Sequence, residues 1–168
     1  MSTSAAARLQ QDAGECFKVE IRDHIAHIVL DRPEKMNAMN RDFWRDLPRI
    51  VREIDEGALA RVIVISSTGK HFTAGMDLSV FTSGPDMKGK ETGRVRANLM
   101  RTVLQLQKTF SCLDEARMPV LMAVQGGCIG GGVDFASACD MRYCTKDAFF
   151  CIQEINIGMT ADVGTFPR

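Results

Sequence analysis

The first third of the chain changes from strand-like to helix-like spacing of its apolar residues. Two runs rich in β-branched residues, CFKVEIR and HIAHIVLD, span residues 16–31 on either side of Asp23 and predict a hairpin or a pair of strands. Asn40 can cap the helix that follows, and Gly57 can end it. This helix is predicted through about Asp55 from apolar side chains at helical spacing: Phe43, Leu47, Ile50, Val51 and Ile54.

Two continuous apolar runs follow, RVIVISS at 61–67 and PVLMAVQ at 119–125. Such runs are typical of strands covered on both faces, as in a sheet built from crossover units. A helix is predicted between them over about residues 94–115, and a short helix over VDFASACD after the second run. MRYCTKDAFF then predicts a pair of short strands, and the tail has the composition of loops and bends. The resulting order, β-β-α-β-α-β-α-β, makes the fold class α/β.

Composition indicates one folded domain. The chain has 168 residues, of which 45% are apolar and 25% charged, and both shares are ordinary for a globular protein. We assign residues 15–168 to this domain and expect residues 1–14 to be a flexible segment without a convincing targeting signal. The 21 basic and 21 acidic residues cancel, so the overall charge favours no nucleic acid partner. No apolar stretch is long enough for membrane insertion.

The cysteines and histidines do not predict a metal site. The six cysteines form no CxxC pair, and we expect them to be reduced core residues of an intracellular protein. His24 and His27 lie three apart in a predicted strand, where alternation sends them to opposite faces, and His71 stands alone. We therefore expect no metal ligands among these residues.

Two glycine-containing loops follow the two buried strands. GGCIGGG at 126–132 lacks the spacing of nucleotide-binding motifs, but glycines at a strand-to-helix junction let a ligand approach the free N–H groups of the helix start. In the loop HFTAGMDL, Gly75 can turn the N–H of Met76 toward a cavity. Both loops lie on one side of the sheet if their strands are parallel neighbours, and two such N–H groups would make an oxyanion hole.

Three segments together, HFTAGMDL, PVLMAVQGGCIGGGVDFASACDMRYC and DAFFCIQEINIGMTADVGT, resemble the crotonase (enoyl-CoA hydratase/isomerase) superfamily from about Val19 onward. The resemblance implies a spiral of β-β-α units and an acyl-CoA substrate that carries its own coenzyme A, with no further cofactor and no metal. It implies an oxyanion hole for the thioester enolate, made by the N–H groups of Met76 and Gly131. It also implies further substrate-binding residues: Ala74, Gly75, Asp77, Leu78, Ser79 and Gly132.

Three acids distinguish among the reactions of the superfamily. Glu154 follows Asp134 by twenty residues, and Asp162 follows Glu154 by eight. Hydratases of the family have glutamates at the first two positions and glycine at the third, whereas this set resembles the Δ3,5-Δ2,4-dienoyl-CoA isomerases of fatty acid β-oxidation. The resemblance implies conversion of 3,5-dienoyl-CoA to 2,4-dienoyl-CoA, with Glu154 acting at C2, Asp162 at C6 and Asp134 as a supporting charge.

Other interpretations of the same residues stay open. An acid in the first turn of a helix, such as Asp134, is often only a helix-terminus charge. Acids in a glycine-containing tail, such as Glu154 and Asp162, are often solvated or part of an Asx turn. On the same scaffold, the alternative activity is that of an enoyl-CoA hydratase or monoene isomerase. Lys88 and Lys90 are candidates for contacts with the phosphates of coenzyme A.

The length of the chain raises an alternative of another class. Superfamily members continue beyond the point that matches Arg168 with a helical C-terminal part, which covers the acyl pocket and builds a trimer or hexamer. We therefore expect a chain truncated before this part, with exposed apolar surface that favours association. The alternative is a non-catalytic acyl-CoA-binding or oligomer-modulating protein. Relatives work in mitochondria or peroxisomes, and the resemblance implies the same location here.

Overall fold

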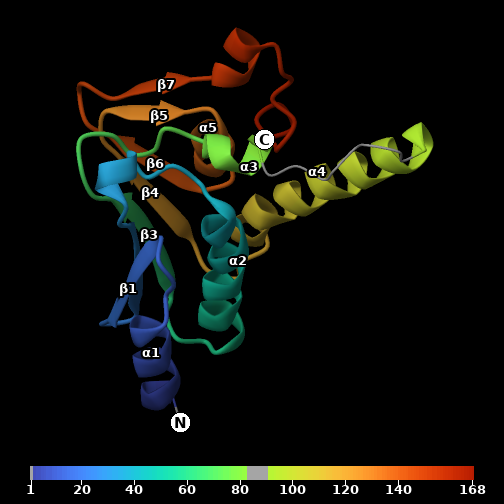
Figure 1. The fold of residues 1–168 in the computed structure, drawn as a ribbon. Helices are drawn as coiled ribbons and strands as arrows, with labels where there is room; N and C mark the ends of the chain where they lie inside the picture. Colours follow the sequence, from blue (N-terminus) through green and yellow to red (C-terminus); the bar gives the residue numbers. More distant parts are fainter. Residues whose placement is uncertain (1, 83–90) are drawn as a thin grey trace.

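The computed structural model describes residues 2–82 and 91–168, and its elements follow the α/β order predicted from the sequence (Figure 1). Lys88 and Lys90 lie outside the described residues. The helices (α), 3₁₀ helices (η) and strands (β) are, in chain order, α1 Ser2–Gln11, β1 Phe17–Arg22, β2 Ile25–Leu30, η1 Pro33–Lys35, α2 Arg41–Glu56, β3 Val62–Ser67, α3 Leu78–Thr82, α4 Thr92–Asp114, β4 Val120–Val124, β5 Gly127–Ile129, α5 Gly131–Ser137, β6 Met141–Cys144, β7 Phe149–Cys151 and η2 Gln153–Ile157.

A five-stranded sheet in the order β1-β2-β3-β4-β6 forms the centre of the fold. β1 and β2 are the predicted antiparallel pair around Asp23, and β3, β4 and β6 follow in parallel. The prediction that β3 is covered on both faces is only partly met, because Ile63 and Ile65 are fully buried whereas Val62 and Val64 on the other face are half-buried.

A second sheet is formed by β5 and β7, which pair in parallel. MRYCTKDAFF therefore supplies two short strands as predicted, and they do not pair with each other, because β6 pairs with β4 and β7 with β5. The reason lies at Gly126, which adopts a positive φ of 56° between β4 and β5. This turn makes the glycine run the start of a new strand, so each of the two later strands has its own parallel partner.

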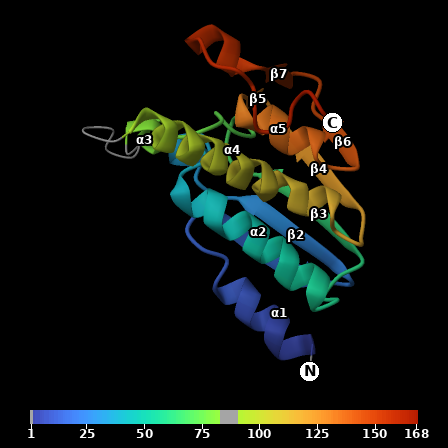
Figure 2. The same cartoon turned by 90° about the vertical axis from the view of Figure 1, so that its right-hand side faces the viewer.

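Helices α2 and α4 lie side by side against one face of the central sheet (Figures 1 and 2). Asn40 caps α2 as predicted, since its side chain accepts the N–H of Phe43 at 3.0 Å. The predicted apolar face of α2 is buried against the strands. An aromatic cluster joins the layers, with neighbouring ring centroids between 5.2 and 6.3 Å apart among Phe43, Trp44, Phe110 and Phe135. This core fixes the layers that carry the loops at the ends of β3 and β4.

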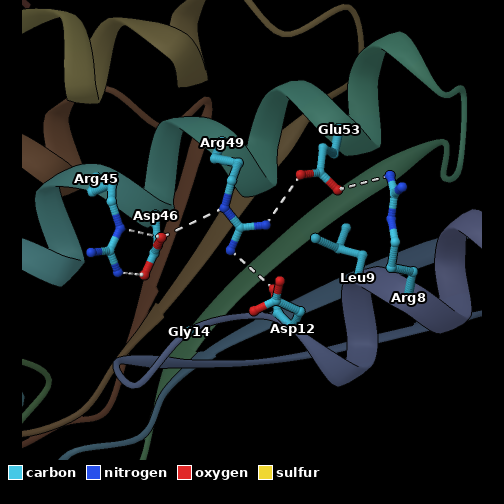
Figure 3. A pocket seen from close by; sticks show the side chains of 8 residues that line it. All are labelled: Arg8, Leu9, Asp12, Gly14, Arg45, Asp46, Arg49 and Glu53. Carbon is cyan, nitrogen blue, oxygen red and sulfur yellow. Dashed lines mark hydrogen bonds and ion pairs between the residues drawn. The ribbon is translucent and has the colours of Figure 1, made fainter.

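The N-terminal segment that was expected to be flexible contains helix α1, which packs on β1 and α2. Leu9 is 1% exposed in this contact. Figure 3 shows the polar contacts beside it, where Arg49 of α2 donates to the carbonyl of Asp12 at 3.0 Å and pairs with Glu53 of the same helix at 3.1 Å, and Arg8 reaches Glu53 at 4.0 Å. These groups line a pocket of about 550 Å³. The Ser- and Ala-rich sequence gave no apolar period from which this helix could be predicted.

Helix α4 extends beyond the sheet, as Figure 1 shows. Its C-terminal end is buried, but three large apolar side chains nearer its N-terminus, Leu99, Met100 and Leu104, are 64%, 65% and 45% exposed. Apolar surface is therefore open on this helix. None of the described helices combines the length and the apolar character that a membrane crossing needs.

Candidate functional site

Two loops meet where the parallel neighbours β3 and β4 end, as the sequence predicted. The N–H of Thr73 donates to the carbonyl of Gly127 at 3.1 Å, and the N–H of Ile129 donates to the carbonyl of Thr73 at 3.1 Å. Gly75 has a φ of +83°, and a Cβ at this position would lie 2.6 Å from the carbonyl oxygen of Ile129. Only glycine permits this approach, which presses the HFTAGMDL loop against the glycine run.

The backbone of Met39 holds the HFTAGMDL loop from its other side. Its N–H donates to the carbonyl of Gly75 at 2.8 Å, and its carbonyl accepts the N–H of Asp77 at 3.1 Å. In such a parallel bridge, the N–H of the residue between the two contacts, Met76, points to the opposite side. Within residues 2–82 and 91–168, neither this N–H nor that of Gly131, the first residue of α5, donates a hydrogen bond. The two free donors support the predicted oxyanion hole.

The other predicted substrate-binding residues lie on these two loops or at the starts of the helices α3 and α5 that follow them. The Asp77 carboxylate accepts the N–H of Ser79 at 3.0 Å, and the hydrogen bonds with Ser79 lower the pKa of Asp77. Leu78 is 73% exposed and Ala74 is half-buried, whereas Gly132 is buried in the first turn of α5. The loops therefore combine an exposed rim with a buried interior, and the binding role of these residues stays a prediction.

The structure brings the three predicted acids together. Asp134 lies in α5 and is fully buried, Glu154 lies in η2 and is half-buried, and Asp162 is exposed in the tail. Burial raises the pKa of Asp134, and the charge of Asp162 raises it further. Burial also raises the pKa of Glu154, and the charges of Asp134 and Asp162 add to this effect. The charge of Asp162 therefore acts on both of the other carboxyl groups, and each of these holds its proton more tightly than a solvated acid does.

Two oxygens of this set have an unusual environment. Oδ2 of Asp134 and Oε2 of Glu154 are buried and have no hydrogen-bond partner among the described residues. The carboxyl group of Glu154 lies next to Gly130, since a Cβ added to this glycine would be 3.2 Å from Oε1 of Glu154. The residue after Gly130 is Gly131, which carries one of the two free N–H groups. Buried polar atoms without partners are rare and costly in folded proteins, and they are frequent at functional sites. Glu154 and Asp134 therefore each keep one buried oxygen that can still accept a hydrogen bond or a proton at these loops.

Thr165 contributes to the site and was not predicted from the sequence. Its backbone N–H and its hydroxyl both donate to Oδ1 of Asp134, each at 2.7 Å. The two residues are 31 positions apart, and nothing in the spacing of the tail distinguishes Thr165 from a loop threonine.

Two of the three histidine side chains, those of His27 and His71, form hydrogen bonds in the folded chain. His24 lies in the β1–β2 turn with a φ of +65° and not in a strand, so the expected alternation with His27 does not apply. His27 in β2 contacts the hydroxyl of Ser66 at 2.8 Å, and Nδ1 of His71 accepts the N–H of Gly127 at 2.9 Å. Among the residues that the structure describes, no group of three histidine, cysteine, aspartate or glutamate side chains could hold a metal ion.

Comparison with known proteins places these features in a family. The model of the enoyl-CoA hydratase/isomerase family matches residues 20–168. The chain belongs to this family. It is 47% identical over 146 residues to the mitochondrial Δ(3,5)-Δ(2,4)-dienoyl-CoA isomerase of Mus musculus, a match that covers 86% of the chain and 45% of the mouse protein. It is 38% identical to the peroxisomal Δ(3,5)-Δ(2,4)-dienoyl-CoA isomerase of Arabidopsis thaliana, covering 92% of the chain and 56% of that protein.

Solved structures of the family have the same fold. An enoyl-CoA hydratase from Shewanella pealeana superimposes with a TM-score of 0.82 at 22% identity, over 94% of this chain and 57% of its own. A Thermobifida fusca structure in complex with acetoacetyl-CoA superimposes with a TM-score of 0.76 at 30% identity, over 99% of this chain and 62% of its own. The predicted crotonase-like α/β fold is thus confirmed. The chain spans about half the length of the curated relatives it matches.

Proposed function

We propose that the protein isomerises 3,5-dienoyl-CoA to 2,4-dienoyl-CoA in fatty acid β-oxidation. The observation that carries the proposal is the grouping of three acids, two of which have a raised pKa and a buried oxygen without a partner, at the loops that carry two free backbone N–H groups. The names of the mouse and Arabidopsis relatives support the same reaction. They also support a mitochondrial or peroxisomal location, which we propose with it.

The oxyanion hole would act on the thioester carbonyl. When a proton leaves C2, negative charge develops on the carbonyl oxygen, and the N–H groups of Met76 and Gly131 are donors free to stabilise it. One such donor typically contributes a factor of about 10²–10³ to the rate. Coenzyme A enters as part of the substrate, so the proposed reaction needs no separate cofactor. The acetoacetyl-CoA bound to the Thermobifida fusca relative supports an acyl-CoA as the ligand.

Two carboxyl groups would move the protons. Glu154 takes the proton from C2, and the electron pair of that C–H bond forms the C2=C3 double bond. The C3=C4 pair then becomes C4=C5, and the C5=C6 pair takes a proton from Asp162 at C6. No atom is oxidised or reduced, and one proton is gained for each one lost. The raised pKa of Glu154 makes its carboxylate a stronger base than a solvated one, and Asp134 supports both transfers through its charge.

An ultraviolet assay tests the proposal against hydration. The 2,4-dienoyl thioester absorbs as an extended conjugated system. Its ultraviolet band should therefore grow when 3,5-dienoyl-CoA is added to the protein, expressed together with any sequence that flanks this chain. A hydratase would instead add water to a 2-enoyl-CoA and remove its absorption band. Hydration of 2-enoyl-CoA without growth of the dienoyl band would refute the isomerase proposal in favour of the hydratase.

Association with further copies is proposed through α4. Its exposed Leu99, Met100 and Leu104 present apolar surface to solvent, and such surface favours contact with another polypeptide. Sedimentation should therefore show an oligomer. A variant with these three residues replaced by glutamine should sediment as a smaller assembly. A wild-type chain that sediments as a stable, active monomer would contradict this proposal and would also oppose an oligomer-modulating role.

A further inference from the structure

Thr165, in the C-terminal tail, forms hydrogen bonds with Asp134 of the site. Both of its donors, the backbone N–H and the hydroxyl, bind Oδ1 of Asp134 at 2.7 Å. Asp134 itself is 0% exposed, and its other oxygen, Oδ2, is buried without a hydrogen-bond partner among the described residues. One carboxylate oxygen is thus saturated by Thr165, and the other is left bare.

This asymmetry has chemical consequences for the carboxyl group. Two short hydrogen bonds to Oδ1 favour the charged form of Asp134, whereas burial and the nearby Asp162 disfavour it. A proton taken up by this group is directed to Oδ2, because the lone pairs of Oδ1 are already occupied by donors. The same two bonds fix the rotamer of Asp134 and hold the tail backbone three residues after Asp162.

Further charged groups surround Asp134 on the elements packed against it. Glu154 approaches from η2 and Asp162 from the tail. Arg168, also in the tail, is committed elsewhere, because it donates to Asp114 at 2.6 Å and to Ser111 at 2.9 Å. Among the described residues, the side chain that donates to Asp134 is therefore that of Thr165, and the backbone N–H groups of Thr165 and of Asp134 itself add to its effect.

We propose that Thr165 is a positioning residue that acts through Asp134. It saturates Oδ1, holds the carboxyl group in one orientation, and leaves Oδ2 as the oxygen available to a proton. The role of this arrangement in catalysis rests on the proposed isomerase function, but the tether itself does not. It can be measured in the protein without substrate.

The test is a carbon-13 NMR titration of the Asp134 carboxyl group in three proteins. Thr165→Val removes the hydroxyl at nearly constant volume, and Thr165→Ser keeps it. We expect the pKa of Asp134 to rise in Thr165→Val, because a donor to the charged form is lost, and to return to the wild-type value in Thr165→Ser. As a matched control, Thr102→Val removes a hydroxyl that only bonds the Asn98 carbonyl within α4, and it should leave the titration unchanged.

The outcomes separate the tether from the reaction. An unchanged Asp134 titration in folded Thr165→Val overturns the proposal. If that variant does not fold, the same question is answered in the wild-type protein. There, the chemical shift of the Thr165 amide proton should change as Asp134 titrates. A constant chemical shift of this proton would also overturn the proposal. In the active enzyme, Thr165→Val should move the acidic limb of the kcat profile to higher pH, and Thr165→Ser should restore it. If the NMR titration gives the expected shifts but the protein makes no dienoyl product, the proposal for Thr165 stands and the proposed isomerase function is refuted.

Discussion

Replacing Gly75 by alanine tests whether close backbone contact holds the two loops of the site together. The residue has a φ of +83°, and an alanine in such a left-handed conformation costs about 1–2 kcal/mol. The added Cβ would also lie 2.6 Å from the carbonyl oxygen of Ile129 and 3.3 Å from its carbon, which are backbone atoms that cannot rotate away. Overpacking of this kind typically costs a further ~1–3 kcal/mol. We therefore expect Gly75→Ala to lower the free energy of unfolding by about 2–5 kcal/mol.

Gly158 offers a matched control for the conformational part of this cost. It has a similar φ of +72°, but a Cβ there would meet nothing within 4 Å. Gly158→Ala should therefore lose only about 1–2 kcal/mol. Urea unfolding of both variants measures the difference, which isolates the contact with Ile129. In the dienoyl assay, Gly75→Ala should also lose a factor of about 10²–10³, because the shifted loop displaces the N–H of Met76. A Gly75→Ala protein that is as stable as Gly158→Ala and fully active would refute the predicted loop geometry.

Two further predictions concern titratable groups. Burial raises the pKa of Asp134 and Glu154 above their ordinary values of 3.8 and 4.5, so the folded chain holds protons that the unfolded chain has lost. The free energy of unfolding should therefore fall as pH rises above these values. Urea unfolding of an Asp134→Asn, Glu154→Gln double variant should show a weaker dependence on pH. An equal pH dependence in the wild type and the double variant would contradict this prediction. Burial raises the pKa of the Cys128 thiol to about 12, whereas Cys144 is exposed, so mass spectrometry should find Cys144 alkylated long before Cys128 in the native protein. Equal rates would contradict this.

The parts of the site that depend on local pattern could be predicted from the sequence. Continuous apolar runs predicted β3 and β4 as strands, and the structure shows that they are parallel neighbours, which was the condition for a shared edge. Because both strands point the same way, the loops at Gly75 and Gly131 had to share one edge of the sheet. The N-cap role of Asn40 likewise needs only three residues of context, since its side chain reaches the N–H of Phe43.

The parts that depend on contacts between distant residues could not be predicted. The backbone of Met39 fixes the loop around Met76, but backbone hydrogen bonds have no signature in the side-chain pattern. Thr165 binds Asp134 across 31 positions, and a threonine in a loop gives no sign of its partner. Helix α1 was missed because it is held by the buried Leu9 and by the ion pair between Arg8 and Glu53, and these contacts leave no apolar period in the sequence.

In the proposed reaction, two different carboxyl groups act at the two ends of the diene, and deuterium exchange can separate their roles. The thioester acidifies the C2 proton, so Glu154 alone should be able to remove and return it. In heavy water, Asp162→Asn should therefore exchange deuterium into C2 of 3,5-dienoyl-CoA while the 2,4-dienoyl ultraviolet band stays absent, and Glu154→Gln should lose both signals. Formation of the 2,4-dienoyl product by Asp162→Asn at the wild-type rate would contradict the account.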